Sequence, residues 1–258
     1  MTPARDTLIA TALGHTPGTT RAIDVGYDFE VVVADDEWVF RFPRRTGVEA
    51  ALELEIELLP AIAPALPVAI PKFEHVSRDP PFVAYRLIRG EPLVDEDPTG
   101  VRAFLDALHA LDVSTLPLER HDWVSSFRKQ CAEFGRVVLP LLDADLRSRA
   151  MQLFGEAETL GGFEAVLLHA DLGPDHLLVH EGRLAGVIDW GDARLGDPAL
   201  DYAWLLNVPF PDWDVDPELR RRARVYHRLG PWYEAHYGLF TSRRGHVERG
   251  LAGIRDRL

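Results

Sequence analysis

The chain has a single cysteine and no long apolar run, and each of these absences excludes a class of protein. With Cys131 alone, it can form neither an intrachain disulfide nor a four-cysteine metal site. No apolar run approaches the roughly 20 residues that cross a bilayer, so we expect no membrane partner. Residues 1–6 lack the basic and apolar regions of a signal peptide. We therefore expect a cytoplasmic protein.

Basic residues are also in the minority. The 258-residue chain carries 28 Lys and Arg against 41 Asp and Glu, a net charge of −13. Nucleic-acid binding needs basic surface that neutralises phosphates, so this balance argues against a nucleic-acid partner. An acidic surface attracts cations instead. The same charge would also serve solubility alone, and composition leaves both interpretations open.

The order of predicted elements divides the chain near residue 90. A length of 258 residues suits one large domain or two lobes. The first part is rich in strands, and the second is mainly helical. Runs of β-branched and aromatic residues predict the strands, and apolar residues at helical spacing predict the helices. The elements predicted before residue 90 are strands at 29–34, 38–42 and 82–88, a helix at 48–59, and a proline-rich extended connector from 60 to 71. Those predicted after it are helices at 101–111, 125–139, 143–160 and beyond 197, with short strands at 165–169, 177–180 and 183–188.

Four polar residues around the predicted second hairpin form the most informative pattern: His169, Asp171, His176 and Asp189. A strand delivers the first two to a loop, and the far arm of the hairpin ends in Asp189. Phosphoryl transfer requires a carboxylate that accepts a hydroxyl proton, beside an oxygen ligand and a polar partner for magnesium. A lone His-x-Asp is more often a pair of loop residues at a strand end. The four residues together favour a catalytic site.

The segments His169-Ala-Asp171 to His176 and Ile188-Asp189-Trp-Gly-Asp192 resemble the catalytic and metal-binding motifs of the aminoglycoside phosphotransferases. Within that group the chain is most similar to the aminoglycoside 2''-phosphotransferases. Many relatives have Asn at the position of His176, whereas the 2'' enzymes, like this chain, have His there, after Asp175. Macrolide 2'-phosphotransferases come next, since residues 41–45 resemble an arginine-rich stretch of theirs. The resemblance runs from about residue 26 to residue 255. It is specific for fold and phosphoryl transfer, and less so for the substrate.

The resemblance implies an α+β, protein-kinase-like fold of two lobes. Residues 1–88 would be the nucleotide-binding lobe, an antiparallel sheet plus a helix. Residues 89–258 would be the mainly helical lobe that carries catalysis and substrate binding. The implied cofactors are Mg²⁺ and a nucleoside triphosphate, GTP or ATP, as phosphoryl donor. We also expect a monomer.

Roles follow from the same resemblance. Asp171 would be the catalytic base, and His176 and Asp189 would hold magnesium. His169 and Asp197 would support the catalytic loop without touching substrate.

The nucleotide would contact the first lobe. Backbone groups of Leu87 and Ile88 would face the nucleobase beside Tyr85, a bulky residue of the kind found in relatives that prefer GTP. Arg41 stands where the family has lysine, and it can contact phosphate through two nitrogens. Glu55 is the expected partner of Arg41. Glu53 and Glu57 are the solvent-facing alternatives.

A cationic antibiotic acceptor would need carboxylates around its pocket. Asp192 is the strongest candidate, because it follows the metal ligand by three residues. The acids beyond residue 210 would equally suit a solvated loop before a helix N-terminus. The full set of predicted substrate-binding residues is Asp192, Asp201, Asp212, Trp213, Asp214, Glu218 and Glu234.

We therefore predict an antibiotic kinase that transfers the γ-phosphoryl of GTP or ATP to a hydroxyl of an aminoglycoside and confers resistance. The alternatives are a macrolide 2'-phosphotransferase and a kinase of another amine-bearing metabolite. A catalytically inactive kinase fold is a further hypothesis. The presence of Asp171 and Asp189 argues against it, and only the arginine at position 41 favours it.

Overall fold

The computed structural model describes residues 4–23, 28–94, 100–119, 122–206 and 215–258. The chain forms two compact units. The first takes in residues 1–93, 98–117 and 175–192, and the second takes in residues 94–97, 118–174 and 193–258. Two segments beyond the predicted boundary at residue 88 thus pack within the first unit. No helix in the described ranges is both long and apolar enough to span a membrane.

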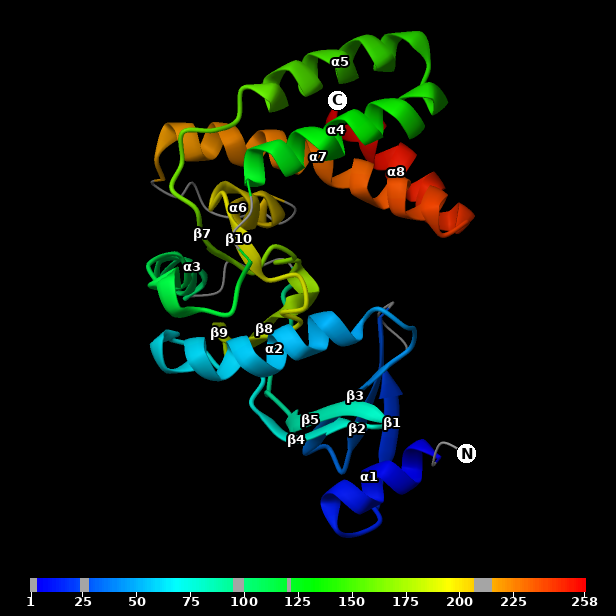
Figure 1. The fold of residues 1–258 in the computed structure, drawn as a ribbon, viewed down its shortest axis with the longest axis vertical. Coiled ribbons are helices and arrows are strands. Elements are labelled where there is room, and N and C mark those ends of the chain that lie inside the picture. The colour runs from blue at the N-terminus through cyan, green and yellow to red at the C-terminus, as the bar shows by residue number, and fades with distance from the viewer. Residues whose placement is uncertain (1–3, 24–27, 95–99, 120–121, 207–214) are drawn as a thin grey trace. The chain divides into compact units, whose positions relative to one another are not determined.

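An antiparallel sheet of five strands, in the order β1-β2-β3-β5-β4, frames the first unit (Figure 1). The predicted hairpin is confirmed as β2 and β3, and the predicted third strand as β5. The edge strands β1 and β4 were not predicted, because their exposed or alternately exposed residues are polar and give a weak signal. The strands are β1 (Thr20–Ile23), β2 (Phe29–Ala34), β3 (Trp38–Pro43), β4 (Phe73–Arg78) and β5 (Pro81–Arg86).

Helices α1 (Arg5–Leu13) and α2 (Glu49–Ile62) cover opposite faces of this sheet (Figure 1). Successive side chains of a strand point to opposite faces. On one face, Ile9 of α1 packs in a cluster with Phe40 of β3. On the other, Leu52 of α2 packs in a cluster with Val83 of β5. The sheet is therefore buried on both sides.

The predicted end of α2 at Pro60 is wrong. The helix continues through Pro60 to Ile62 and passes into the 3₁₀ turn η1 (Ala63–Ala65). A proline removes one helical hydrogen bond and need not end a helix in its last turn. Leu59 and Ile62 are almost fully buried there, and this burial offsets the lost bond.

A second, three-stranded sheet completes the first unit, in the order β6-β8-β9. The β8–β9 pair is the second predicted hairpin. It is fastened to the chain after α2: the Ala69 amide donates to the Ala185 carbonyl (3.1 Å), and the Val187 amide donates to the Ala69 carbonyl (2.9 Å). A Cβ on Gly186 would lie 2.4 Å from Ile88 Cγ2, so this approach requires glycine. The remaining elements here are β6 (Glu91–Pro92), α3 (Val101–His109), η2 (Val113–Thr115), η4 (Pro174–His176), β8 (Leu177–His180) and β9 (Arg183–Val187).

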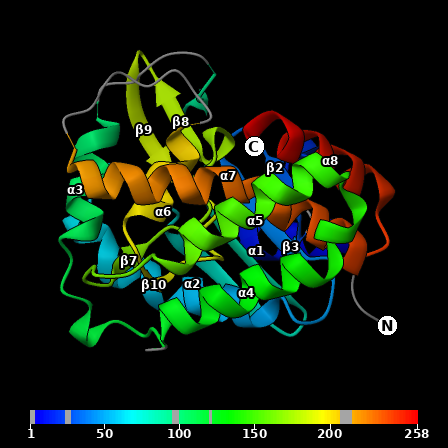
Figure 2. The same ribbon diagram turned by 90° about the horizontal axis from the view of Figure 1, so that it is seen from above.

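The second unit is mainly helical, as predicted. Helix α7 packs along α6 and α8, and α4 lies beside α5 (Figures 1 and 2). The two-stranded pair β7–β10 is its only sheet in the described ranges, and the three-residue β10 was too short to predict. Its elements are α4 (Trp123–Val137), η3 (Leu139–Leu141), α5 (Ala144–Glu158), β7 (Val166–Leu168), β10 (Arg194–Gly196), α6 (Ala199–Leu205), α7 (Pro217–Phe240) and α8 (Arg244–Arg257).

Cys131 lies buried in α4. Burial raises the pKa of its thiol to about 12, so the group stays protonated near neutral pH.

Candidate active site

A buried ion pair joins β3 to α2 in the first unit. Arg41 lies opposite Val31 and Val83 in the strand register, and Val83 belongs to the face that α2 covers. The Arg41 side chain therefore points to α2, where its Nη1 donates to Glu55 Oε2 (2.6 Å). Of the three acids considered on α2, Glu55 is the partner, and Glu53 instead binds Arg78 at the surface.

The Arg41–Glu55 pair is almost completely removed from water, at 5% and 0% side-chain exposure. Burial alone would lower the pKa of Arg41, but Glu55 and Asp189 raise it above its ordinary value. Burial raises the pKa of Glu55, and the Arg41 guanidinium opposes that rise. The Arg41 guanidinium also lies 4.1 Å from the Phe29 ring centroid. These contacts fix a permanent positive charge on the α2 face of the sheet.

Asp189 reaches this charge from the end of β9, 148 residues along the chain. Its Oδ1 accepts from Arg41 Nη2 at 3.2 Å. The hairpin register pairs Leu177 with Val187, so His176, which precedes Leu177, lies at the same end of the hairpin as Asp189. Oδ2 of Asp189 lies 3.6 Å from His176 Nε2. The structure therefore brings the predicted metal ligands together.

The turn that presents Asp189 is anchored on both sides. Asp189 has a left-handed backbone, with φ of 64°, a conformation that Asp tolerates better than most residues. The next residue, Trp190, is fully buried, donates to the Val187 carbonyl (3.1 Å) and packs edge-on against Phe104 of α3. The Asp189 side chain itself is 48% exposed. A buried anchor thus holds an accessible carboxylate.

His176 and Asp189 are the predicted magnesium ligands, and the structure brings two such side chains together. Within the described ranges, no group of three His, Cys, Asp or Glu side chains could hold a metal. Magnesium in phosphoryl-transfer sites is commonly held by one or two protein ligands, and substrate phosphates and water complete the shell. His176 and Asp189 lie together beside Arg41. Two such side chains would suit a metal ion that enters with a nucleotide better than they would suit a permanently bound metal.

The predicted nucleobase contacts are only partly available. Tyr85 lies on the same sheet face as Arg41, and burial raises its pKa to about 12, so its hydroxyl stays neutral. The Leu87 amide donates to the Glu37 carbonyl (2.8 Å). This amide is therefore engaged with the chain itself. The Leu87 carbonyl and the Ile88 backbone stay predicted contacts.

Asp171 belongs to the second unit, where it follows β7. The preceding residue, Ala170, has a left-handed backbone with φ of 68°. This conformation costs an L-residue about 1–2 kcal/mol. Asp171 is half-buried, and its amide lies 3.4 Å from Nδ1 of the fully buried His169. The loop before the predicted base is therefore bent and packed.

Helix α6 supports this loop through two side chains. The Asp201 carboxylate accepts from the amides of His169 (3.1 Å) and Ala170 (2.8 Å). Trp204 Nε1 donates to the Ala170 carbonyl (3.3 Å). Asp201 is fully buried, so its predicted contact with substrate is wrong: both oxygens bind the catalytic loop. The sequence signal was present, because Asp201 lies among the apolar residues of a short helix.

Asp197, which we expected to brace the catalytic loop, has other partners. It is fully buried and accepts from Arg222 Nε (2.8 Å) and Nη2 (3.1 Å) and from the Tyr226 hydroxyl (3.1 Å), both on α7. The amide of Ala199 donates to it as well (3.0 Å). Asp197 thus joins the start of α6 to α7, and the bracing contact belongs to Asp201. Sequence reasoning missed Arg222 because it lies in an arginine run that resembles solvated surface.

The remaining predicted substrate residues differ in availability. Asp192 is exposed in the first unit. Glu218 binds Arg221 within α7 (2.6 Å), and Glu234 binds Arg249 of α8 (2.7 Å). Three further predictions lie outside the described residues: Asp212, Trp213 and Asp214.

Comparisons with known proteins agree with this geometry. A model of the phosphotransferase enzyme family, APH, matches residues 19–239. An uncharacterized Bacillus subtilis (strain 168) protein, YcbJ, is 28% identical over 207 residues, which cover 69% of this chain and 67% of YcbJ.

Solved structures match over nearly the whole chain. The GDP and kanamycin complex of APH(2'')-IIIa is 25% identical, with a TM-score of 0.86 and 97% of each chain covered. The apoenzyme of the macrolide 2'-phosphotransferase MphH from Brachybacterium faecium is 27% identical, with a TM-score of 0.76 and coverage of 96% of this chain and 98% of that one. The α+β fold predicted from the family resemblance is confirmed. The chain belongs to the phosphotransferase enzyme family and is a phosphotransferase.

Proposed function

We propose that this phosphotransferase moves the γ-phosphoryl group of GTP or ATP to a hydroxyl group of an aminoglycoside, which would inactivate the antibiotic. The observation that carries the proposal is the contact of Arg41 with both Glu55 and Asp189. It places a fixed positive charge beside a carboxylate and an imidazole that suit Mg²⁺. The GDP and kanamycin bound by APH(2'')-IIIa support the choice of donor and acceptor.

In this proposal Asp171 is the base. Its carboxylate takes the proton of the acceptor hydroxyl, the hydroxyl oxygen bonds to the γ-phosphorus, and the bond to the β-phosphate oxygen breaks. Arg41 donates to the phosphate oxygens, for which its planar fork is suited. Magnesium, held by His176 and Asp189, supplies charge neutralisation when it is bound with the nucleotide. Tyr85, beside the nucleobase of the nucleotide, favours GTP as the donor.

Asp192 is the proposed contact for an acceptor amine. It is exposed, and it follows the metal ligand Asp189 by three residues. A cytoplasmic location, a monomeric state and the lack of a nucleic-acid partner stay predictions.

A macrolide is the second candidate acceptor, and a specific observation favours it. Asp201 is buried, and Glu218 and Glu234 bind arginines of the chain itself. These contacts leave fewer carboxylates for a polycation than the sequence suggested. A macrolide, which has one amine and a broad apolar face, needs fewer carboxylates in its site.

Nucleotide turnover with each class of acceptor separates the two candidates. We expect phosphate transfer from GTP or ATP to kanamycin- or gentamicin-like compounds, with mass spectrometry locating the phosphorylated hydroxyl. Transfer to macrolides alone would keep the mechanism and change the acceptor. Nucleotide binding without transfer to either class would contradict the proposed acceptors.

A further inference from the structure

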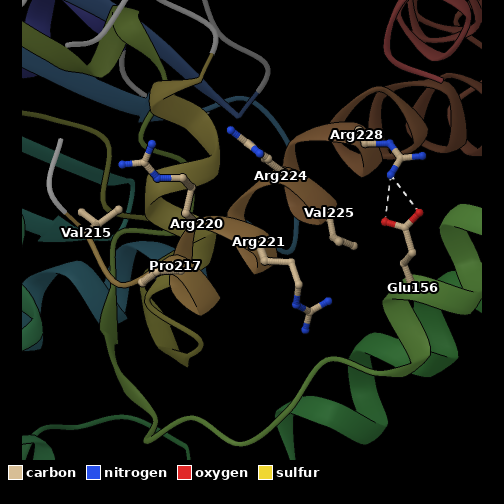
Figure 3. Close-up of a pocket in the computed structure, with 8 residues that line it drawn as sticks. All are labelled: Glu156, Val215, Pro217, Arg220, Arg221, Arg224, Val225 and Arg228. Carbon is tan, nitrogen blue, oxygen red and sulfur yellow. Dashed lines mark hydrogen bonds and ion pairs between the residues drawn. The ribbon is translucent and has the colours of Figure 1, made fainter. Parts of the chain in front are cut away.

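A pocket of about 620 Å³ lies beside α7 in the second unit. Its walls come from the start of α7 and from α5, and none of its lining residues belongs to the predicted catalytic or metal groups (Figure 3). The volume lies within the range of small-molecule sites, about 300–1,000 Å³. The lining residues are Glu156, Val215, Pro217, Arg220, Arg221, Arg224, Val225 and Arg228.

The arginines of this pocket follow the period of the helix. Arg220, Arg224 and Arg228 are four residues apart, so they recur along one face of α7. Arg221 adds a fourth guanidinium to the lining. The next residue, Arg222, points into the protein instead, where it binds Asp197. The helix therefore divides its arginine run between the core and the pocket.

Among the described residues, carboxylates offset part of this positive charge, and Arg220 also makes an interaction of its own. Glu156 of α5 binds Arg228 at 2.9 and 3.1 Å across the pocket (Figure 3). Glu218 binds Arg221 from outside the lining (2.6 Å). Arg224 is exposed and has no partner within the described ranges. The eight lining residues carry four positive charges and one negative charge.

This local excess contrasts with the whole chain, whose net charge is −13. A cationic acceptor would be repelled from the pocket, so it is not a site for an aminoglycoside. An extended nucleic acid would reach beyond the pocket and meet the rest of an acidic protein. A compact anion bound in the pocket avoids both penalties. Guanidinium forks match phosphate oxygens geometrically, which favours phosphate groups as the anionic part.

We propose that the pocket between α5 and α7 binds a small molecule that carries two or more phosphate groups, at a site separate from the phosphate contact of Arg41. The site adds a ligand that the proposed reaction does not use.

Calorimetric titration with inorganic tripolyphosphate tests the proposal on the full chain. The wild type, Arg41→Ala and the double variant Arg220→Ala/Arg224→Ala are compared without magnesium. Binding should survive Arg41→Ala, which removes the proposed nucleotide-phosphate contact. When Arg220→Ala/Arg224→Ala is added to Arg41→Ala, binding should weaken at least tenfold. The loss of two charge-assisted contacts accounts for a weakening of this size.

A matched control is Arg244→Ala/Arg255→Ala on α8, which removes two exposed positive charges elsewhere. It should leave the affinity within about twofold, and an equal loss there would show that general charge accounts for the binding. Arg224→Glu alone repeats the test with one exposed residue in case the double variant folds poorly. Unchanged tripolyphosphate affinity in both α7 variants would overturn the proposal. Tighter binding of a DNA duplex than of tripolyphosphate, lost in the same variants, would overturn it in favour of nucleic acid.

Discussion

Ala170 carries backbone strain directly before the proposed base. Its φ of 68° is unfavourable for alanine, yet the amide and carbonyl of this residue are both held by α6. Strain of this kind persists only where the surroundings over-determine it, and it is common at functional sites. The loop conformation is thus imposed by packing and hydrogen bonding, and not by local preference.

The substitution Ala170→Gly should therefore be tolerated. Glycine adopts this backbone without the Cβ penalty of about 1–2 kcal/mol, which exceeds the roughly 0.5–1 kcal/mol by which glycine favours the unfolded chain. Urea unfolding should show stability equal to the wild type or up to about 1 kcal/mol higher. The control Ala203→Gly lies within α6 and should lose about 1 kcal/mol. A clear loss of stability in Ala170→Gly would contradict the claim that the backbone of Ala170 is strained.

Substitutions of Arg41 separate the effect of its charge from that of its geometry at the proposed phosphate contact. Arg41→Ala leaves the carboxylate of Glu55 buried without a partner, which costs about 3–5 kcal/mol. Arg41→Lys keeps the charge but loses the fork that joins Glu55 to Asp189, so its cost should be smaller. Urea unfolding measures stability, and titration with magnesium nucleotide measures affinity.

The order wild type, Arg41→Lys, Arg41→Ala should hold for both measurements. If Arg41→Ala binds nucleotide as tightly as the wild type, the assignment of Arg41 to the phosphates is wrong. Equal stability of all three proteins would contradict the buried ion pair instead.

At the scale of elements, α6 holds the loop that precedes the proposed base Asp171. Asp201 accepts two backbone amides with its two carboxylate oxygens, and an asparagine of the same size can accept only one. Asp201→Asn should destabilise the protein by about 1–3 kcal/mol. It should also lower kcat more than it raises KM for nucleotide, because Asp201 supports the loop of Asp171.

Asp216→Asn is the matched control, since this exposed residue caps the start of α7 and asparagine caps nearly as well. It should change neither property appreciably. A full kcat in folded Asp201→Asn would show that the loop keeps its shape without α6.

The junction of α6, α7 and α8 should also respond to pH. His227 of α7 contacts the Ala203 carbonyl through Nδ1 (3.2 Å), and burial, then Arg257, lowers its pKa below the ordinary 6.5. Below pH 6.5 the unfolded chain therefore takes up a proton that the folded chain resists. Stability should fall as the pH drops from about 7 to 5.

His227→Gln should flatten this pH dependence, because it removes the titrating group. His180→Gln, an exposed control on β8, should leave the slope unchanged. Stability measured by urea unfolding at pH 5, 6 and 7 gives the comparison, and an equal slope in wild type and His227→Gln would contradict the assignment.

Strongly patterned elements could be predicted from the sequence, and weakly patterned ones could not. The hairpin β2–β3 has runs of β-branched and aromatic residues on both sides of a short acidic turn, and α3 has a clear apolar face. In contrast, β10 has three residues, and β4 alternates exposed polar positions at a sheet edge. The continuation of α2 through Pro60 depends on tertiary burial, which a local pattern does not contain.

The candidate site was predictable where spacing and pairing coincide. Glu55 is the partner of Arg41 as expected, and Asp189, which the hairpin brings to the same place, joins this pair. That Asp201 holds the loop before Asp171, while Asp197 joins the start of α6 to α7, was not predicted. Both acids stand at the start of one short helix, and only its packing decides which faces the catalytic loop.

At the scale of the whole molecule, the proposed chemistry is shared between the two compact units. The phosphate and metal residues Arg41, His176 and Asp189 belong to the first unit, and Asp171 belongs to the second. The family match and the solved structures extend over both.

The central claim is tested most directly by acceptor-dependent turnover of GTP and ATP in wild type and Asp171→Asn, across a panel of aminoglycosides and macrolides. The account predicts phosphorylated aminoglycoside with the wild type. It predicts a rate at least about 10²-fold lower in Asp171→Asn, with nucleotide affinity retained. Equal turnover by the two proteins would contradict the assignment of Asp171 as the base. The absence of a phosphorylated aminoglycoside from a folded, nucleotide-binding wild type would contradict the proposed function.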